Sequence, residues 1–417
     1  MMSTPPNGPG TGTPDATAPS TGPSAEPSTI PPTDPSTIPP TDPSANPPVG
    51  RSRPRGGTLA LRPRGLWLVT SLELRQRIRS ARWYVALGIW TLLLFGIGVL
   101  SLAPALYTTE WGVVREVARV MFSLQMILVL LAMLLVTPAL SAGSINGDRS
   151  AGTLATLQAS LLSPLEIVLG KLLAGLVTGL AFLVLAMPSA LPLALLGEVS
   201  IFYLLRVTAT ICFLTFCVTA IGLGLSALTQ RQLGSVVLAY VLVFGVTVVG
   251  PILWGVSATF LTTQQEVTSY YTEYTDYEDF EDASTGGVCV ASTDVQGVWR
   301  MDLAQPLMWP NPLVMLAETA PRQHIGGYWQ GESDAQVDAL SIMKYGMREA
   351  SSPPHPSDHN HCSPEDADYP DLGAPTQIPQ WPMGVAAWGV VALGALAVAV
   401  ARLRVPIRRL GPGTRIA

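Results

Sequence analysis

Six blocks of predominantly apolar residues constrain what this chain can fold into more than any other feature of its sequence. Each block has about 20 residues or more, the length that a helix needs to cross a hydrocarbon core about 30 Å thick. Lipid cannot satisfy the hydrogen bonds of irregular backbone, and the blocks lack the alternating pattern of barrel strands. They therefore predict an all-α polytopic membrane protein with six transmembrane helices. The predicted spans are residues 84–106, 117–141, 169–196, 202–228, 234–258 and 383–402.

Basic residues gather at one end of these predicted helices. By the positive-inside bias that end faces the cytoplasm, so we expect both termini to be cytoplasmic and the protein to lie in the cell membrane, either plasma membrane or bacterial inner membrane. Arg115 and Arg119, in the first outer loop near Glu110 and Glu116, are exceptions that do not reverse this orientation. The residues that set it are Arg62, Arg64, Arg75, Arg77, Arg79, Arg82, Arg149, Lys171, Arg231, Arg402, Arg404, Arg408, Arg409 and Arg415.

Acidic residues dominate the opposite side, in the segment 259–380. This segment holds 19 of the 29 acidic residues and 4 of the 24 basic ones, a net charge of −15, which leaves +10 on the rest of the chain. The net charge of −5 therefore hides a dipolar protein, and we expect no nucleic-acid partner. The segment is predicted to be a large exterior insertion between spans five and six.

The ends of the chain differ from its middle in composition. Residues 1–57 are rich in Pro, Ser, Thr and Gly and repeat STIPPTDP at 28–35 and 36–43. Such a tract has too little apolar surface to offset chain entropy, so we expect a disordered cytoplasmic tail, either a spacer or a ligand for a proline-binding partner. It has no secretory signal pattern, so the first span is expected to direct insertion. The other predicted boundaries are 84–258 for spans one to five, 381–402 for span six and 403–417 for a basic cytoplasmic tail.

A basic amphipathic segment precedes the first span, at residues 66–83. Leu68 and Leu72 lie at helical spacing, and Trp67 and Trp83 accompany a group of arginines. Such a segment can lie in the headgroup layer with its aromatic rings at the interface. We interpret it as an interfacial elbow helix, and the alternative is an ordinary positively charged flank of the first span. Its arginines are Arg75, Arg77 and Arg79.

A polar stretch, NGDRSAGTLATLQASLLSPLEIVLGK at 146–171, interrupts the apolar sequence between spans two and three. Asp148 or Ser150 can cap a short helix over about 151–162, whose stripe of leucines needs a protein partner or the bilayer interface to pack against. The Ser-Pro-Leu-Glu at 163–166 is a capping box with Pro at the first helical position, which restarts a helix into the third span. The stripe consists of Leu154, Leu157 and Leu161.

The longer segment TPALSAGSINGDRSAGTLATLQASLLSPLEIVLGK, at 137–171, resembles the membrane subunits of type-2 ATP-binding cassette (ABC) exporters. It has their order of features: a small-residue run, an acidic-Arg pair, Gly-Thr-Leu, a Leu-rich turn, a Ser/Pro helix start and a Gly-Lys at the entry to the third span. The basic elbow, the six spans and the large last loop extend the resemblance to roughly residues 66–410. Ser150 and Ala155 depart from it, because the family often has acids there, and this affects charge complementarity with a partner.

The resemblance implies that the chain is the permease subunit of an ATP-driven exporter. The polar stretch would be a coupling helix, at 148–162, which docks on a separate cassette ATPase and transmits its closure to the spans; a plain cytoplasmic loop is the alternative. ATP and Mg would bind in that partner, and no cofactor in this chain, because Gly170-Lys171 lacks the upstream glycine and the hydroxyl residue of a phosphate loop. A homodimer or a heterodimer of permease subunits would sit in the bilayer. The implied ATPase contacts are Asp148, Arg149, Gly152, Thr153, Leu154 and Leu157.

Two other classes of function compete with transport. One is a membrane-anchored sensor or assembly factor whose exterior domain binds a ligand. The other is a membrane enzyme, which is disfavoured because the sequence has no Ser/His/Asp or His-Glu-x-x-His constellation. A neighbouring gene for a cassette ATPase would favour transport over both.

Two segments of the predicted insertion carry weaker signals. HPSDHNHC, at 355–362, groups three histidines with an Asp and a Cys that suit Zn²⁺ or Cu²⁺, but it lacks a recognised ligand spacing, and we assign no metal site. TSYYTEYTDYEDFEDAS, at 268–284, interleaves aromatic and acidic residues. It is either a surface for cations or a basic partner, or simply a solvated acidic surface.

Single residues complete the set of candidate sites. Cys289 and Cys362 are the outer cysteines, and we expect them to form a disulfide in an oxidising exterior, whereas the two cysteines of span four are expected to pack as small apolar side chains. Arg206 lies in the outer half of span four. It either faces a translocation path or extends to the outer interface toward Glu198.

Overall fold

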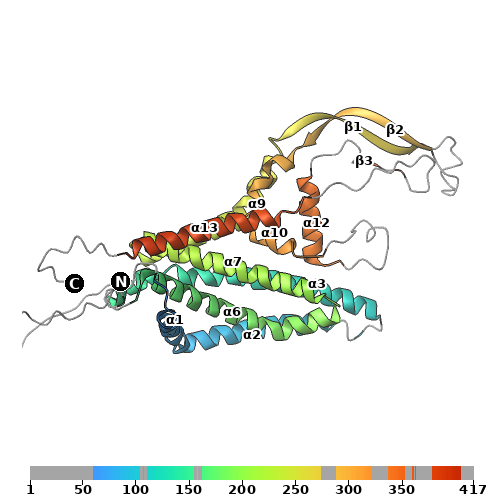
Figure 1. Cartoon of the computed structure of the whole chain (residues 1–417). Helices are drawn as coiled ribbons and strands as arrows, with labels where there is room; N and C mark the ends of the chain where they lie inside the picture. The colour runs from blue at the N-terminus through green and yellow to red at the C-terminus, as the bar shows by residue number, and fades with distance from the viewer. Residues whose placement is uncertain are drawn as a thin grey trace, which may run out of the picture. The chain divides into compact units, whose positions relative to one another are not determined.

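Six helices of the computed structural model are long and apolar enough to cross a membrane, which confirms the six predicted spans (Figure 1). The structure describes residues 60–103, 107, 110–154, 157, 162–273, 288–321, 337–352, 359–360, 362 and 378–404. The N-terminal tail predicted at 1–57 and most of the C-terminal tail lie outside these residues. The six spans are Trp83–Leu102, Trp111–Ser150, Pro164–Leu196, Ile201–Leu228, Gln232–Ser257 and Trp381–Arg402.

The segment predicted as an elbow helix, 66–83, is divided between two helices. The first, α1 (Pro63–Ile78), has a proline in its first turn, where the missing N–H costs no hydrogen bond. The second, α2 (Ala81–Leu102), follows a break at 79–80 and provides the first span. The predicted boundaries were therefore wrong at both ends, because a proline starts α1 earlier and the chain turns before Trp83 rather than after it.

Three helices form the buried centre of the membrane-spanning part: α3 (Trp111–Ser141), α6 (Pro164–Leu196) and α7 (Ile201–Leu228). A Cβ on Gly175 of α6 would lie 2.7 Å from the methyl group of Thr219 in α7, so a side chain at this glycine would force Thr219 to shift. Small residues at contacts are typical of helix packing in lipid. The last span, α13 (Trp381–Arg402), packs along α7 (Figure 1). Large, fully buried side chains include Phe122, Met126, Leu130, Ile211 and Leu214.

The fifth span changes its helical pitch halfway along. It consists of α8 (Gln232–Phe244), the π-helix η3 (Gly245–Val249) and α9 (Gly250–Ser257). Pro251 accounts for the change, because it has no N–H to donate to the carbonyl of Thr247, four residues earlier, and its ring clashes with that carbonyl in a regular α-helix. Wider turns of this kind occur frequently at functional sites.

The insertion between spans five and six adds a small sheet, which the sequence analysis did not predict, to a mostly helical fold (Figure 1). Strands β1 (Thr262–Glu273) and β2 (Val288–Trp299) pair antiparallel over their whole length. The two-residue strand β3 (His359–Asn360) lies parallel to β1, which gives the order β2-β1-β3. A disulfide joins Cys289 in β2 to Cys362 after β3.

Short helices of the insertion hold it against the spans, through hydrogen bonds of the residues that cap these helices. Asn311 accepts hydrogen bonds from the first N–H groups of α10, and its amide donates to two carbonyls of η3 at 3.1 and 3.2 Å. Asp338 caps α12 and accepts a hydrogen bond of 2.7 Å from the Tyr203 hydroxyl of α7. Arg348 and Glu318 form a buried two-bond ion pair, at 2.8 and 2.6 Å, between α12 and the end of α10. The helices are η5 (Met301–Leu307), α10 (Pro312–Ala317) and α12 (Ala339–Ser351).

Candidate functional site

The polar stretch between spans two and three begins as a helix, α4 (Ser144–Ser150), directly after α3. The sequence did not predict α4, and Asp148 and Ser150, the two proposed caps of the helix predicted over 151–162, lie inside it. The next helical residue that the structure describes is Thr153, two residues after the predicted start. The first N–H groups of a helix have no partner within it. Here the Ser226 hydroxyl of α7 accepts two of them, from Ile145 at 3.2 Å and Asn146 at 3.1 Å, so a tertiary contact fixes where this helix starts.

One side of α4 is bound to the connection between α7 and α8. The buried Asn146 amide donates to the hydroxyls of Thr229, at 2.9 Å, and Ser235, at 3.4 Å. Arg149 donates to the Asn146 side chain at 3.0 Å and to the Thr229 carbonyl at 3.2 Å. Arg149 therefore binds this connection. Because its side chain is also exposed, its positive charge remains accessible to a partner.

The other side of α4 reaches a buried cation. Lys171 of α6 forms an ion pair with Glu73 of α1, and its Nζ lies 2.7 Å from Asp148 Oδ2, without hydrogen-bond geometry. The Lys171 side chain is only 1% exposed, against 12% for Glu73 and 20% for Asp148. A buried charge is tolerated when it is paired. We call these three residues the charge triad, and it joins α1, α4 and α6.

The Gly-Lys at the entry to span three is explained by the same contact. A Cβ on Gly170 would lie 2.6 Å from Val69 of α1, so this glycine lets α1 approach closely enough for Glu73 to reach Lys171. The Thr70 hydroxyl lies 3.2 Å from the Gly170 carbonyl, within hydrogen-bonding distance. No structural role was predicted for Lys171, although a lone lysine just inside an apolar block indicates a buried, paired charge.

The capping box predicted at the start of α6 is confirmed. The Ser163 hydroxyl accepts from the Glu166 N–H at 3.1 Å, and the Glu166 carboxylate accepts from the Ser163 N–H at 2.8 Å. The second carboxylate oxygen of Glu166 accepts from the Arg62 N–H at 2.7 Å, just before α1. This buried glutamate therefore sets the start of both α1 and α6.

Beyond α4 the chain turns at the surface. Residues 149–153 are exposed, and we call them the exposed turn. Gly152 has a φ of +72°, in the left-handed region that glycine adopts without steric cost after a helix end. The Thr153 hydroxyl lies 3.3 Å from the Asp148 carboxylate, which links the turn to the charge triad. Residues 153, 154 and 157 are helical, and 155–156 and 158–161 lie outside the described residues.

The leucines expected to meet a partner are buried within this chain. Leu154 is only 7% exposed and belongs to the hydrophobic core, and Leu157 is half-buried against that core. For Leu154 this overturns the expectation of an external surface, because periodicity shows that a face is buried but not by what. Leu161, the third residue of the stripe, lies outside the described residues. Among the expected ATPase contacts, Arg149, Gly152 and Thr153 are exposed.

The arrangement of α1, α4 and α6 falls within a known domain. A family model described as ABC-2 family transporter protein matches residues 67–315, more than half of the chain. The chain belongs to the ABC-2 family of transporters. The ABC-2 domain runs from α1 to α10 and contains the charge triad and the exposed turn. A search of curated proteins finds no match. Together with the six spans, the family makes the protein a multi-pass membrane protein and the permease component of an ABC transporter.

Within the ABC-2 domain the three arginines of the predicted elbow differ. Arg77 turns into the bundle, where it donates to the Thr178 hydroxyl at 2.8 Å and to the Leu140 carbonyl at 3.3 Å. Burial lowers the pKa of the Arg77 guanidinium, and the neighbouring Glu73 carboxylate partly opposes this. Arg75 and Arg79 are exposed. Arg77 therefore has a structural contact, whereas Arg75 and Arg79 alone retain the surface position expected of an interfacial helix.

The expected partner of Arg206 is occupied. Glu198, in the turn between α6 and α7, forms an exposed ion pair of 3.1 Å with Arg115 of α3. Arg119, which the sequence placed in the first outer loop, lies with Arg115 in α3 and donates to the Gly197 carbonyl at 3.1 Å. Arg206 itself is exposed on α7. Glu198 therefore pairs with Arg115, the two alternatives for Arg206 stay predictions, and Arg115 and Arg119 of α3 hold the turn between α6 and α7.

The structure describes only parts of the two remaining candidate segments of the insertion, the possible metal ligands at 355–362 and the aromatic and acidic segment at 268–284. Cys362, the thiol in the proposed group of metal ligands, is bound to Cys289 and is not available as a thiolate ligand. The side chains of the other members of that group lie outside the described residues. Of the aromatic and acidic segment at 268–284, only residues up to Glu273 are described, and they form the end of β1.

Proposed function

We propose that this ABC-2 permease exports its substrate with energy supplied by a separate cassette ATPase, and that the ATPase docks on the exposed turn. One observation supports the docking site: α4 and the exposed turn that follows it are joined by hydrogen bonds and ion pairs to four other helices. Arg149 and Asn146 bind the connection between α7 and α8, and the Asp148–Lys171–Glu73 triad binds α6 and α1. Energetic coupling between distant sites travels through such packed and hydrogen-bonded elements.

The further parts of the proposal follow from the family and the charge distribution. ATP and Mg bind in the ATPase, because this sequence has no phosphate loop. The basic end of the spans, with both termini and the exposed turn, lies in the cytoplasm, and the insertion lies outside the cell membrane. Two permease subunits, identical or related, share one transporter. Span one and span five are the natural contact surfaces, since little of either is buried within this chain.

A bulky substitution at the exposed turn tests the docking site. Thr153→Trp should leave the amount of permease in the membrane unchanged, because the side chain is exposed. The bulky indole would disrupt a central contact with the ATPase, which typically costs about 2 kcal/mol or more of binding free energy. We therefore expect about 30-fold weaker binding of the ATPase in co-purification, and loss of ATP-driven transport.

Thr259→Trp, beyond the opposite end of span five, is the matched control, because Thr259 is also an exposed threonine. It should retain the ATPase at wild-type yield. If the Thr153 variant also retains the ATPase and transports normally, the docking site is elsewhere. If neither the variants nor the wild-type protein binds a cassette ATPase, a sensor or assembly role becomes the better account.

A further inference from the structure

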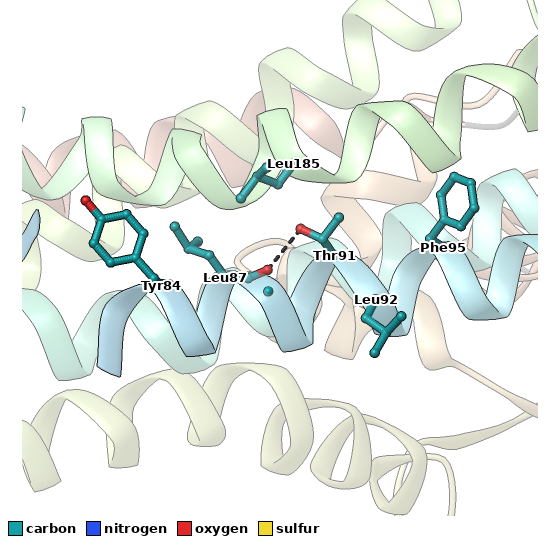
Figure 2. A pocket seen from close by; sticks show the side chains of 7 residues that line it. Tyr84, Leu87, Thr91, Leu92, Phe95 and Leu185 are labelled. Atoms are coloured by element: carbon teal, nitrogen blue, oxygen red, sulfur yellow. Dashed lines mark hydrogen bonds between the residues drawn. The ribbon is translucent and has the colours of Figure 1, made fainter. Parts of the chain in front are cut away.

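A groove of about 570 Å³ lies along span one, between α2 and α6 (Figure 2). Its base is formed by Leu87, Thr91 and Leu185, which are partly buried. Gly88 leaves it open, because a Cβ at this position would meet no atom within 4 Å. The Thr91 hydroxyl donates to the Leu87 carbonyl at 2.9 Å, so this hydroxyl needs no ligand, and the lining suits a hydrocarbon chain (Figure 2). The exposed side chains of the rim are Tyr84, Leu92 and Phe95.

Aromatic contacts hold the two helices of the groove together. Trp83 and Trp90 of α2 pack edge-to-face against Phe182 of α6, with ring centroids 5.3 and 6.1 Å from that of Phe182. The Trp90 indole also donates to the Phe182 carbonyl at 3.1 Å. The groove is therefore formed by contacts within this chain, as is usual for sites that bind small molecules.

The groove has the length of one bilayer leaflet. From Tyr84 to Phe95 it follows α2 for about 16 Å, at the helical rise of 1.5 Å per residue. Half of a hydrocarbon core about 30 Å thick is about 15 Å. Tyr84 lies in the first turn of α2, and tyrosines at the ends of spans lie at the level of the lipid headgroups. The Tyr84 end of the groove therefore lies at the headgroups of the leaflet on the side of α1.

Two exposed positive charges lie beside that end. Only the break at 79–80 separates α1 from α2. Arg75 and Arg79 are spaced as neighbours on one face of a helix, and both are exposed. The acidic residue of α1, Glu73, is paired with Lys171 in the charge triad, so it is not free to neutralise these arginines. Guanidinium groups suit phosphate, with which they form two parallel hydrogen bonds.

We infer that α1 and the α2–α6 groove together bind one anionic phospholipid from the leaflet on the side of α1. Arg75 and Arg79 bind the headgroup phosphate, and an acyl chain lies in the groove from Tyr84 toward Phe95. The charge selects the lipid class, because a zwitterionic headgroup brings a cation of its own toward the two arginines and an anionic headgroup such as phosphatidylglycerol brings none.

Photolabelling in vesicles tests the inference. The full-length protein is reconstituted in phosphatidylcholine with a trace of phosphatidylglycerol, or of phosphatidylcholine, that carries a photoactivatable group in one acyl chain, and labelled residues are mapped by mass spectrometry. At 84–95 and at Leu185, phosphatidylglycerol should give about 30-fold more labelling than phosphatidylcholine, from about fivefold for each arginine. The two lipids should label the exposed residues Val390, Val391 and Leu393 of α13 equally.

Arginine variants test the headgroup contact. The double variant Arg75→Gln, Arg79→Gln should lose the preference for phosphatidylglycerol, whereas Arg402→Gln, at an exposed arginine in the last turn of α13, should keep it. Equal labelling of the wild-type groove by the two lipids, which would mean annular lipid only, would overturn the inference. So would a preference that survives in the double variant; if that variant also loses the cassette ATPase in co-purification, the two arginines bind the ATPase.

Glycine variants test the groove. Gly88→Trp places an indole in the groove and should remove the labelling of Leu185, whereas Gly394→Trp, which also enters open space, should not. Undiminished labelling of Leu185 in Gly88→Trp would show that the acyl chain lies outside the groove and would overturn the inference. A second copy of the chain is the competing occupant. If Gly88→Cys forms a disulfide between copies and the wild-type groove is not labelled, the groove is a subunit interface and binds no lipid.

Discussion

The charge triad makes a quantitative prediction about stability. Lys171→Met keeps most of the side-chain length but removes the cation that lies between Glu73 and Asp148. Two carboxylates then face each other with no positive charge between them. Removing one partner of a buried ion pair typically costs about 3–5 kcal/mol, because the other charge stays buried and unpaired. Since Glu73 and Asp148 keep 12% and 20% of their side-chain surface, water relieves part of this cost, and we expect about 3 kcal/mol.

Two comparison variants distinguish the effect of unpaired charge in the triad from a general effect of mutation. Arg115→Met breaks the ion pair with Glu198, whose side chains are 48% and 56% exposed, and should cost no more than about 1 kcal/mol. The triple variant Glu73→Gln, Asp148→Asn, Lys171→Met removes all three charges together and should recover most of the lost stability, because no buried charge remains unpaired.

The assay is the free energy of unfolding of the purified protein in mixed micelles, measured for the four proteins under one condition. The reasoning is refuted if Lys171→Met is as stable as Arg115→Met. It is also refuted if the triple variant is no more stable than Lys171→Met, since the loss would then come from packing and not from the unpaired carboxylates.

Three further predictions concern packing and covalent structure. Gly170→Ala should cost about 1–3 kcal/mol in the same unfolding assay, because its Cβ would lie 2.6 Å from Val69, whereas Gly147→Ala, which meets nothing within 4 Å, should not destabilise the protein. Leu154→Asp buries an unpaired charge and should reduce the amount of folded protein in the membrane, whereas Thr153→Asp, at an exposed position, should not; equal membrane levels would contradict the assignment of Leu154 to the core. The denatured protein should show two free thiols before reduction and four after it, and an unchanged count would exclude the disulfide of the insertion.

Features encoded within a short stretch of sequence were predictable. A span is visible in the sequence because every residue of a long block must tolerate lipid. The start of α6 was predictable because both partners of its capping box, Ser163 and Glu166, lie within one helical turn. The same holds for the order of features around Gly170 and Lys171, which pointed to the family although it did not explain these residues.

Features that depend on distant contacts were not predictable. The start of α4 depends on Ser226, in another helix, and α4 has no capping side chain of its own. The pairing of Lys171 with Glu73 joins residues that no local pattern connects. Leu154 shows the limit most clearly, because a leucine stripe has the same periodicity whether a partner or the chain's own core covers it. The sheet was missed because the insertion was assessed for charge, metal ligands and cysteines but not for strand patterns.

Site-specific cross-linking between the permease and the ATPase tests the docking site most directly. A photoreactive amino acid replaces Thr153 in one variant and Thr259 in another, and each is expressed in cells together with the cassette ATPase that co-purifies with the wild-type permease. The account predicts a covalent adduct with the ATPase from the residue that replaces Thr153 and none from the residue that replaces Thr259. An adduct from the Thr259 position alone, or no adduct from the Thr153 position in a complex that still co-purifies, would contradict it.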